Sequence, residues 1–224
     1  MKKVTVFSRP SFSLDPAKTA LIVVDMQNEF LRKGGALYVP AAGKTIKNHQ
    51  ELIQTCRKIR IPIFFIKYIT PPAPTIWRKY APTFAEPPLK GCWKGLVRYF
   101  PDVRKRLDAT DIIKEIYPQP EDYVVEKNWF DSFWASPLES YLRAHGTEYV
   151  IITGTVTEVC VEATAKGAYL RNFHTVVVSD AVSSATPKYH RLVLELLAKR
   201  WARVMKTSEV IHELRGKKFT LRGR

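Results

Sequence analysis

The feature of this sequence that most constrains its fold is the alternation of short apolar runs with stretches of helical periodicity. Six runs, the central ones rich in Val and Ile, occur at 20–24, 61–66, 123–125, 149–152, 175–178 and 202–205. Continuous rather than alternating apolar runs are typical of parallel strands that are covered on both faces. The runs therefore predict an α/β fold, a doubly wound three-layer αβα sandwich around a mostly parallel six-stranded sheet.

Between these runs, apolar residues recur at helical spacing. One predicted helix ends before Pro62, because proline cannot continue a helix. A second predicted helix covers 188–200. The apolar residues that define the two patterns are Ile46, Leu52, Ile53, Cys56 and Ile59 in the first, and Tyr189, Leu192, Val193, Leu196 and Leu197, expected as a buried stripe, in the second.

One segment interrupts the alternation. Residues 70–122 are rich in proline and include Trp77 and Trp93, which makes the segment too aromatic for a disordered linker. A long insertion in a compact α/β domain often covers a pocket. A rim or oligomer contact without a catalytic role is an equally good interpretation, and the sequence leaves both open.

Charge and cysteine content limit the partners and the compartment. The formal net charge is +15, from 36 basic and 21 acidic residues, but the basic residues are dispersed and no nucleic-acid-binding motif is visible. We therefore expect a solvated basic surface and no nucleic acid partner. No apolar run approaches the roughly 18 residues of a membrane span, so no membrane association is expected. Cys56, Cys92 and Cys160 form no CxxC pair, and the start MKKVTVFSRP lacks an apolar signal region, which favours the cytoplasm.

Polar residues of three different kinds follow three of the predicted strands. Asp25 follows the first strand, Lys127 the third and Cys160 the fourth. Open α/β sheets bind ligands at the carboxyl ends of their strands. An acid, a base and a thiol are thus expected to converge on one crevice.

Cys160 is the strongest single candidate. Thr157 is a plausible helix N-cap, which predicts Cys160 in the first turn of a helix. The positive helix end and a nearby Lys127 would lower the thiol pKa from its free value of about 8.5. Asp25 would accept the thiol proton and later deliver it to a leaving amine. The alternative is that Cys160 is a small buried apolar residue, as most free cysteines are.

At this point the sequence resembles a known family, the isochorismatase-like cysteine hydrolases. Three ordered blocks carry the resemblance, which runs from about 19 to 211: LIVVDMQNEF with a following GGAL, EKNWFDSFWASPLESYLRAHG, and VIITGTVTEVCVEATAKGAYLRNFHTVVVSDA. The PQPEDYVVEK approach to the lysine is most similar to the ureidoacrylate and N-carbamoyl amidohydrolase branch. The resemblance implies a single domain over 1–224, with the insertion at about 70–122.

The resemblance also implies roles for individual residues. Asp25 is implied as the proton-transfer acid and base, Lys127 as its charge partner and Cys160 as the nucleophile. A cis peptide bond is implied at Thr155–Val156, aiming the Val156 and Cys160 amides into an oxyanion hole. The family usually forms dimers or tetramers, so a homo-oligomer is expected. No cofactor is expected, and no metal, because IKYITPPAP stands where zinc-dependent relatives have Asp-x-His.

These residues predict a cysteine-dependent hydrolase of a C–N bond in a small amide, ureido or carbamoyl compound, acting through a thioester. Three aromatic residues are candidates for pocket walls, although each is equally compatible with core packing: Phe30, Trp77 and Trp129. Two alternatives remain open. One is vinyl ether hydrolysis of the isochorismatase type by Asp25 and Lys127, and the other is a basic binding protein without enzymatic activity.

Overall fold

The computed structural model describes residues 9–73 and 75–216. Its core is a six-stranded sheet in the order β5-β2-β1-β6-β7-β8, in which every neighbouring pair is parallel. The predicted α/β fold and the six predicted strands are therefore confirmed. The strands span Thr19–Val24 (β1), Ile63–Tyr68 (β2), Tyr123–Lys127 (β5), Tyr149–Thr155 (β6), His174–Ser183 (β7) and Arg203–Met205 (β8).

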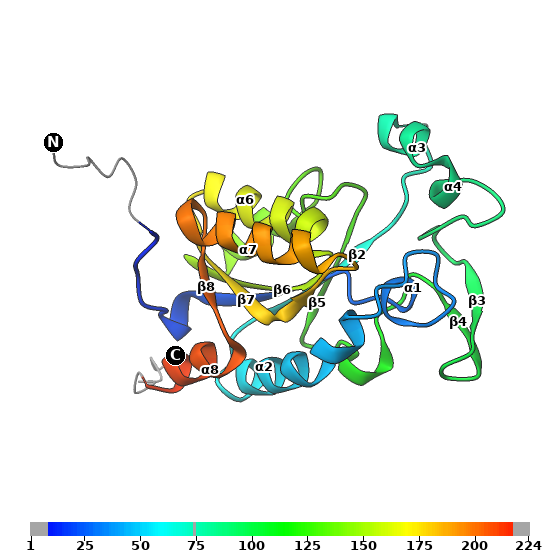
Figure 1. Cartoon of the computed structure of the whole chain (residues 1–224). Coiled ribbons are helices and arrows are strands. Elements are labelled where there is room, and N and C mark those ends of the chain that lie inside the picture. The colour runs from blue at the N-terminus through cyan, green and yellow to red at the C-terminus, as the bar shows by residue number, and fades with distance from the viewer. Residues whose placement is uncertain (1–8, 74, 217–224) are drawn as a thin grey trace, which may run out of the picture.

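Helices cover both faces of the sheet, as Figure 1 shows. On one face lie α2 (Ile46–Lys58) and α8 (Thr207–Gly216), and on the other α5 (Leu138–Ala144), α6 (Glu162–Leu170) and α7 (Pro187–Arg200). Short helical segments connect these layers: η1 (Pro16–Lys18), α1 (Asn28–Leu31), η2 (Ala42–Thr45), η3 (Lys114–Ile116) and the π-helical turn η4 (Thr157–Val161). Among the described residues, no helix is long and apolar enough to cross a membrane.

The side chains on the two faces of each central strand pack into two separate hydrophobic cores. Along β1, Leu21 and Val23 pack with α2 and α8, whereas Ile22 and Val24 pack with α5, α6 and α7. Successive residues of a strand point to opposite faces, so a strand buried on both faces needs an unbroken apolar run. The continuous TALIVV sequence of β1, buried throughout, meets this requirement.

The strand order reverses between β1 and β6, and in doubly wound sheets a crevice that binds ligands is typical of such a place. From β1 the chain adds β2 and then β5 on one side, and from β6 it adds β7 and β8 on the other. At such a reversal the loops that leave the carboxyl ends of the two central strands diverge, and ligands bind there. Gly154 allows β6 to lie close to β1 at this point, because a Cβ at Gly154 would stand 1.9 Å from the Val24 carbonyl oxygen.

The segment between β2 and β5 forms a separate layer at this end of the sheet. It contains α3 (Ile76–Tyr80), α4 (Pro82–Ala85) and the antiparallel hairpin of β3 (Val97–Phe100) and β4 (Lys105–Asp108). Figure 1 shows it beside α1, which follows the end of β1. An ion pair ties it to the body of the molecule, with 2.9 Å between Arg98 Nε and the fully buried Glu29. The insertion therefore lies against the segment that follows the carboxyl end of β1.

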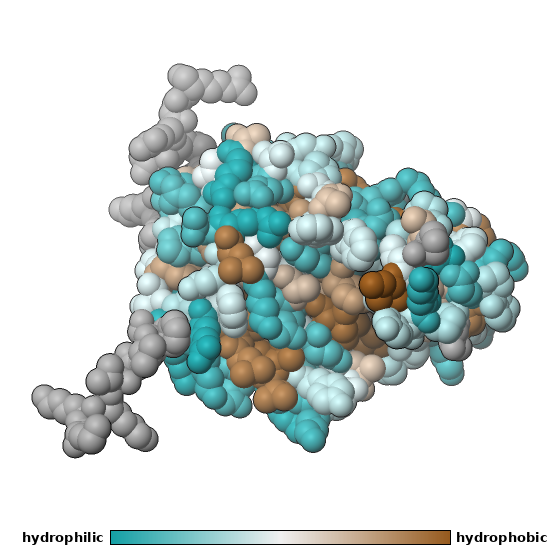
Figure 2. All heavy atoms as spheres, turned by 90° about the horizontal axis from the view of Figure 1, so that it is seen from above, coloured by the Kyte–Doolittle hydropathy of each residue, from teal (hydrophilic) through white to brown (hydrophobic). Residues whose placement is uncertain are grey.

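The buried stripe predicted on α7 is only partly correct. Val193 and Leu197 are buried, but Tyr189, Leu192 and Leu196 are 52%, 48% and 45% exposed. The apolar positions span a wider arc of the helix than the sheet can cover, so only the inner line is buried. Figure 2 looks down on this layer and shows hydrophobic side chains among the polar ones at its surface.

Candidate active site

The carboxyl ends of three strands bring together the three residues singled out from the sequence. Asp25 follows β1, Lys127 is the last residue of β5, and Cys160 lies in η4 directly after β6. Lys127 Nζ stands 3.0 Å from Asp25 Oδ2, and both side chains are fully buried. The Cys160 thiol lies close enough to both groups that Lys127 lowers its pKa and Asp25 raises it. The expected convergence of acid, base and thiol is thus present, at the reversal of strand order.

Burial dominates the electrostatics of the Asp25–Lys127 pair. Loss of water raises the pKa of Asp25 above its ordinary value of 3.8, although the Lys127 ammonium acts to lower it. Burial also lowers the pKa of Lys127, but Asp25 and Cys160 outweigh that effect, and the pKa ends above its ordinary value. A raised carboxyl pKa makes Asp25 a stronger proton acceptor than a solvated aspartate.

The thiol differs from the sequence prediction in two ways. Burial raises the pKa of Cys160, since Lys127 lowers it less than burial and Asp25 raise it, so the predicted lowering is wrong. Thr157 is not the N-cap either, because η4 begins at Thr157 and Val156 precedes it without a side-chain cap. Cys160 therefore sits in a wide π-helical turn, a feature that is frequent at functional sites.

The η4 turn is held at both ends. The peptide bond Thr155–Val156 is cis, as the resemblance implied. The Val156 carbonyl oxygen accepts from Val159 N at 3.1 Å and from Val161 N at 3.2 Å. Thr157 Oγ1 lies 2.9 Å from His190 Nδ1 of α7. These contacts fix the backbone on which Cys160 and its amide are placed.

The loop after β5 orients Lys127 and is tied to α6. Lys127 Nζ donates to the Phe130 carbonyl oxygen at 2.8 Å. Two residues further on, buried Ser132 contacts buried Thr164, with 2.8 Å between the two hydroxyl oxygens and 3.2 Å from Ser132 N to Thr164 Oγ1. Because Thr164 follows Cys160 by about one helical turn, the continuous segment of η4 and α6 positions both the thiol and the loop after Lys127.

Sequence reasoning missed Gln27, a buried amide in the first block. Its Nε2 donates to the carbonyl oxygens of Tyr68 at 3.0 Å and Thr110 at 2.8 Å, and its Oε1 accepts from Tyr68 N at 2.8 Å. Gln27 thus joins the loop after β1 to the end of β2 and to the insertion. The signal was available, since a glutamine directly after a buried strand needs partners for three or four hydrogen bonds.

The aromatic residues expected as pocket walls lie in two different places. Trp77 and Trp129 line a cavity of about 320 Å³ next to Lys127, together with Tyr68, Thr75, Ile76, Tyr80, Asn128 and Phe130. Phe30 is 2% exposed and belongs to the core on the α2 side of the sheet. It is not among the residues that line this cavity.

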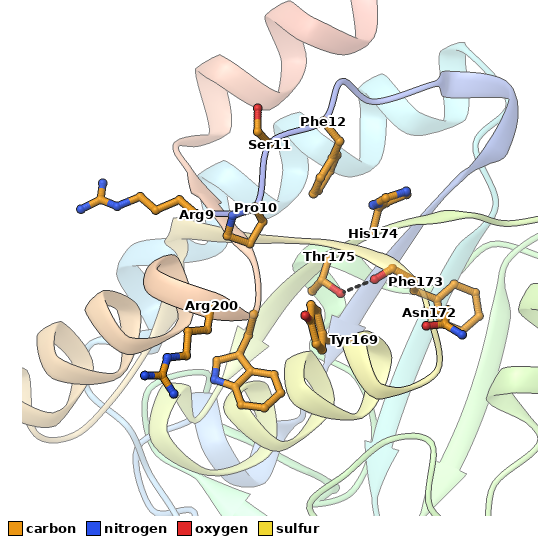
Figure 3. A pocket seen from close by; sticks show the side chains of 11 residues that line it. Arg9, Pro10, Ser11, Phe12, Tyr169, Asn172, Phe173, His174, Thr175 and Arg200 are labelled. Atoms are coloured by element: carbon orange, nitrogen blue, oxygen red, sulfur yellow. Dashed lines mark hydrogen bonds between the residues drawn. The ribbon is translucent and has the colours of Figure 1, made fainter. Parts of the chain in front are cut away.

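A larger hollow lies away from the candidate site. It measures about 610 Å³ and lies where β7 begins, at the opposite end of that strand from the crevice. Figure 3 shows its lining, in which Phe12 and His174 stand near one another and Thr175 Oγ1 donates to the Phe173 carbonyl oxygen at 3.1 Å. None of its described lining residues is a cysteine, lysine or carboxylate, so it offers no counterpart to the chemistry of the crevice.

Comparison with known proteins agrees with the fold. Residues 19–209 match the isochorismatase domain family. A cysteine hydrolase from Pseudomonas syringae pv. phaseolicola 1448A superimposes with a TM-score of 0.83 at 24% identity, over 94% of this chain and 99% of that one. N-carbamoylsarcosine amidase from Thermoplasma acidophilum gives a TM-score of 0.66 at 30% identity, over 85% and 96%. The chain therefore belongs to the isochorismatase family of hydrolases.

A zinc-bound relative raises the question of a metal. Pyrazinamidase of Pyrococcus horikoshii, in complex with zinc, gives a TM-score of 0.67 at 25% identity, over 84% of this chain and 99% of that one. In the part of this chain that the structure describes, no three His, Cys, Asp or Glu side chains gather to hold a metal ion. After β2 stand Ile69 and Thr70, which supply no imidazole or carboxylate. The residues present do not fit a zinc site of the usual nitrogen, sulfur and carboxylate ligands.

Proposed function

We propose that the protein hydrolyses a C–N bond in a small amide, ureido or carbamoyl compound, with Cys160 as nucleophile. The observation that carries the proposal is the fully buried Asp25–Lys127 ion pair with the Cys160 thiol within reach. Burying two charges is costly unless geometry and further contacts compensate, and substitution by apolar residues is often no less stable. An acid, an ammonium and a thiol packed together at the carboxyl ends of parallel strands instead have the chemistry of acyl transfer.

In the first half of the proposed reaction, Asp25 takes the proton from Cys160 as the sulfur attacks the substrate carbonyl carbon. The negative oxygen of the tetrahedral intermediate accepts hydrogen bonds from the backbone amides of Val156 and Cys160. The C–N bond then breaks, and the leaving amine or ammonia takes the proton from Asp25. The acyl group remains on the sulfur as a thioester, or as a thiocarbamate for a ureido substrate.

In the second half, a water molecule attacks the thioester carbonyl and gives a proton to Asp25. The C–S bond breaks, and the proton returns to the sulfur, which restores the resting site. Lys127 stays an ammonium throughout. Its charge stabilises the negative charge that develops on the sulfur, and it holds Asp25 in place through the 3.0 Å contact. No step changes an oxidation state.

An ammonia-release screen over small amides, ureas and carbamoyl compounds tests the proposal. Cys160→Ala should lose turnover, because no covalent intermediate can form. Cys56→Ala is the matched control and should leave turnover unchanged, since Cys56 lies on the buried face of α2, in the core on that side of the sheet. Full activity in Cys160→Ala overturns the nucleophile. Turnover of isochorismate that survives the loss of the thiol favours vinyl ether hydrolysis instead.

A further inference from the structure

The cavity beside Lys127 is placed to hold the part of a substrate that does not react. Tyr68 ends β2, and Asn128, Trp129 and Phe130 follow Lys127 directly. The Lys127 Nζ atom lies 6.0 Å from the centre of the Tyr68 ring and donates to the Phe130 carbonyl oxygen. Two of the residues that form the cavity wall therefore also contact the ammonium of the candidate site.

Aromatic rings form much of the wall of this cavity. The rings of Trp77 and Tyr68 are 5.9 Å apart at 65°, and those of Trp77 and Phe130 are 5.7 Å apart at 78°. Tyr68 and Phe130 are 6.4 Å apart at 36°. Rings at these spacings present both faces and edges, and a further flat ring stacks on such surfaces favourably. Trp77 belongs to α3, so the insertion supplies one side of this cavity.

The cavity contains little that would hold a charge. None of its described lining residues is acidic or basic. Thr75 Oγ1 already accepts from Arg78 N at 3.3 Å, and Asn128 Nδ2 already donates to the Ile69 carbonyl oxygen at 2.8 Å. A carboxylate bound here would contact no cationic side chain among the described lining residues, whereas a flat apolar group would pack against the rings. The volume of about 320 Å³ lies at the small end of ligand sites and suits a single ring with a short side chain.

We infer that the substrate is an amide or ureide whose non-reacting part is an uncharged aromatic or other flat apolar group, bound between Tyr68, Trp77 and Phe130. This inference rests on the proposed function, because it names the substrate of that site. Trp77 is the residue that sets the preference, and the insertion that carries it thereby acts as a recognition element.

Phenylacetamide and malonamic acid form a matched pair of test substrates, because they differ only in a phenyl ring or a carboxylate next to the same CH₂–amide. The expected result is a kcat/KM for phenylacetamide at least about 100-fold higher than that for malonamic acid. Trp77→Ala should lower the phenylacetamide value about tenfold or more and leave acetamide unchanged, since acetamide has no ring. Trp77→Phe should retain most of the preference. Trp134→Ala, at an exposed tryptophan outside the cavity, is the control and should change neither value.

Binding separates failure of this inference from failure of the proposed function. Phenylacetamide is titrated into the native protein and into Trp77→Ala by calorimetry. Binding that needs Trp77 but leads to no hydrolysis of any amide supports the cavity and overturns the proposed function. Hydrolysis that favours malonamic acid, or that is indifferent to Trp77 in a folded variant, overturns the cavity inference and leaves the function standing. If phenylacetamide does not bind and no amide is hydrolysed, both the cavity inference and the proposed function are overturned.

Discussion

Replacement of Lys127 by methionine tests whether the candidate site is as buried as the structure shows. Methionine has a similar length and no charge, so the change leaves Asp25 without its ammonium partner in a fully buried position. An uncompensated buried charge costs about 3–5 kcal/mol of folding free energy. We expect Lys127→Met to lose about this much stability at pH 8.

The loss should depend on pH in a defined direction. Without Lys127, burial raises the pKa of Asp25 further, because the ammonium is the main group that lowers it. The folded protein then binds more protons than the unfolded chain at every pH between the unfolded value of 3.8 and the raised folded value. The free energy of unfolding of the variant therefore falls as pH rises through that window, by up to about 1.4 kcal/mol per pH unit.

Urea unfolding at pH 5 and pH 8, followed by tryptophan fluorescence, measures the effect. The double variant Asp25→Asn/Lys127→Met removes both charges, and asparagine tolerates the left-handed backbone of residue 25, where φ is +51°. It should be more stable than Lys127→Met at pH 8. A single variant that loses less than about 1 kcal/mol at both pH values would refute a water-free ion pair.

Three further outcomes are expected. Burial lowers the pKa of His49 to about 4, so at pH 5 the unfolded chain binds a proton that the folded protein does not. The free energy of unfolding should therefore fall by about 2 kcal/mol between pH 8 and pH 5. His49→Asn should remove this pH dependence in urea titrations. Thr164→Val deprives Ser132 of its hydrogen-bond partner and should lower the free energy of unfolding by about 1–3 kcal/mol and also lower kcat. Thr164→Ser should restore both the stability and kcat. Burial raises the pKa of Asp25, so kcat/KM should fall about tenfold per pH unit on an acid limb centred above 3.8, and a limb at or below that value would contradict the assignment.

The fold and the meeting of the three residues could be predicted because both depend on local sequence. A strand buried on two faces must be apolar throughout, and the runs around β1 and β6 show this directly. Once the order of strands and helices is known, the carboxyl ends must lie on one edge. Asp25 and Cys160 follow strands and Lys127 ends one, so all three had to lie on that edge.

The contacts that hold the site were not visible in the sequence because they join residues far apart in the chain. Ser132 and Thr164 are ordinary polar residues, and only the packing of the β5 loop against α6 makes them partners. The exposure of Leu192 and Leu196 has a similar origin. Periodicity shows that one side of α7 is apolar, but the width of the surface that covers it is a property of the neighbouring layers.

The sign of the Cys160 pKa shift was predicted wrongly because burial of the thiol also depends on residues far apart in the chain. The corrected sign changes the expected order of proton transfer in the reaction. Helix position and Lys127 both favour a thiolate, but burial of Cys160 outweighs them. The resting sulfur is then protonated, and the proton must leave as attack occurs. Because the Asp25 carboxylate raises the thiol pKa, Asp25→Asn should speed alkylation of Cys160 by iodoacetamide while it abolishes turnover. A parallel fall of both rates would mean that Asp25 ionises the thiol before substrate arrives.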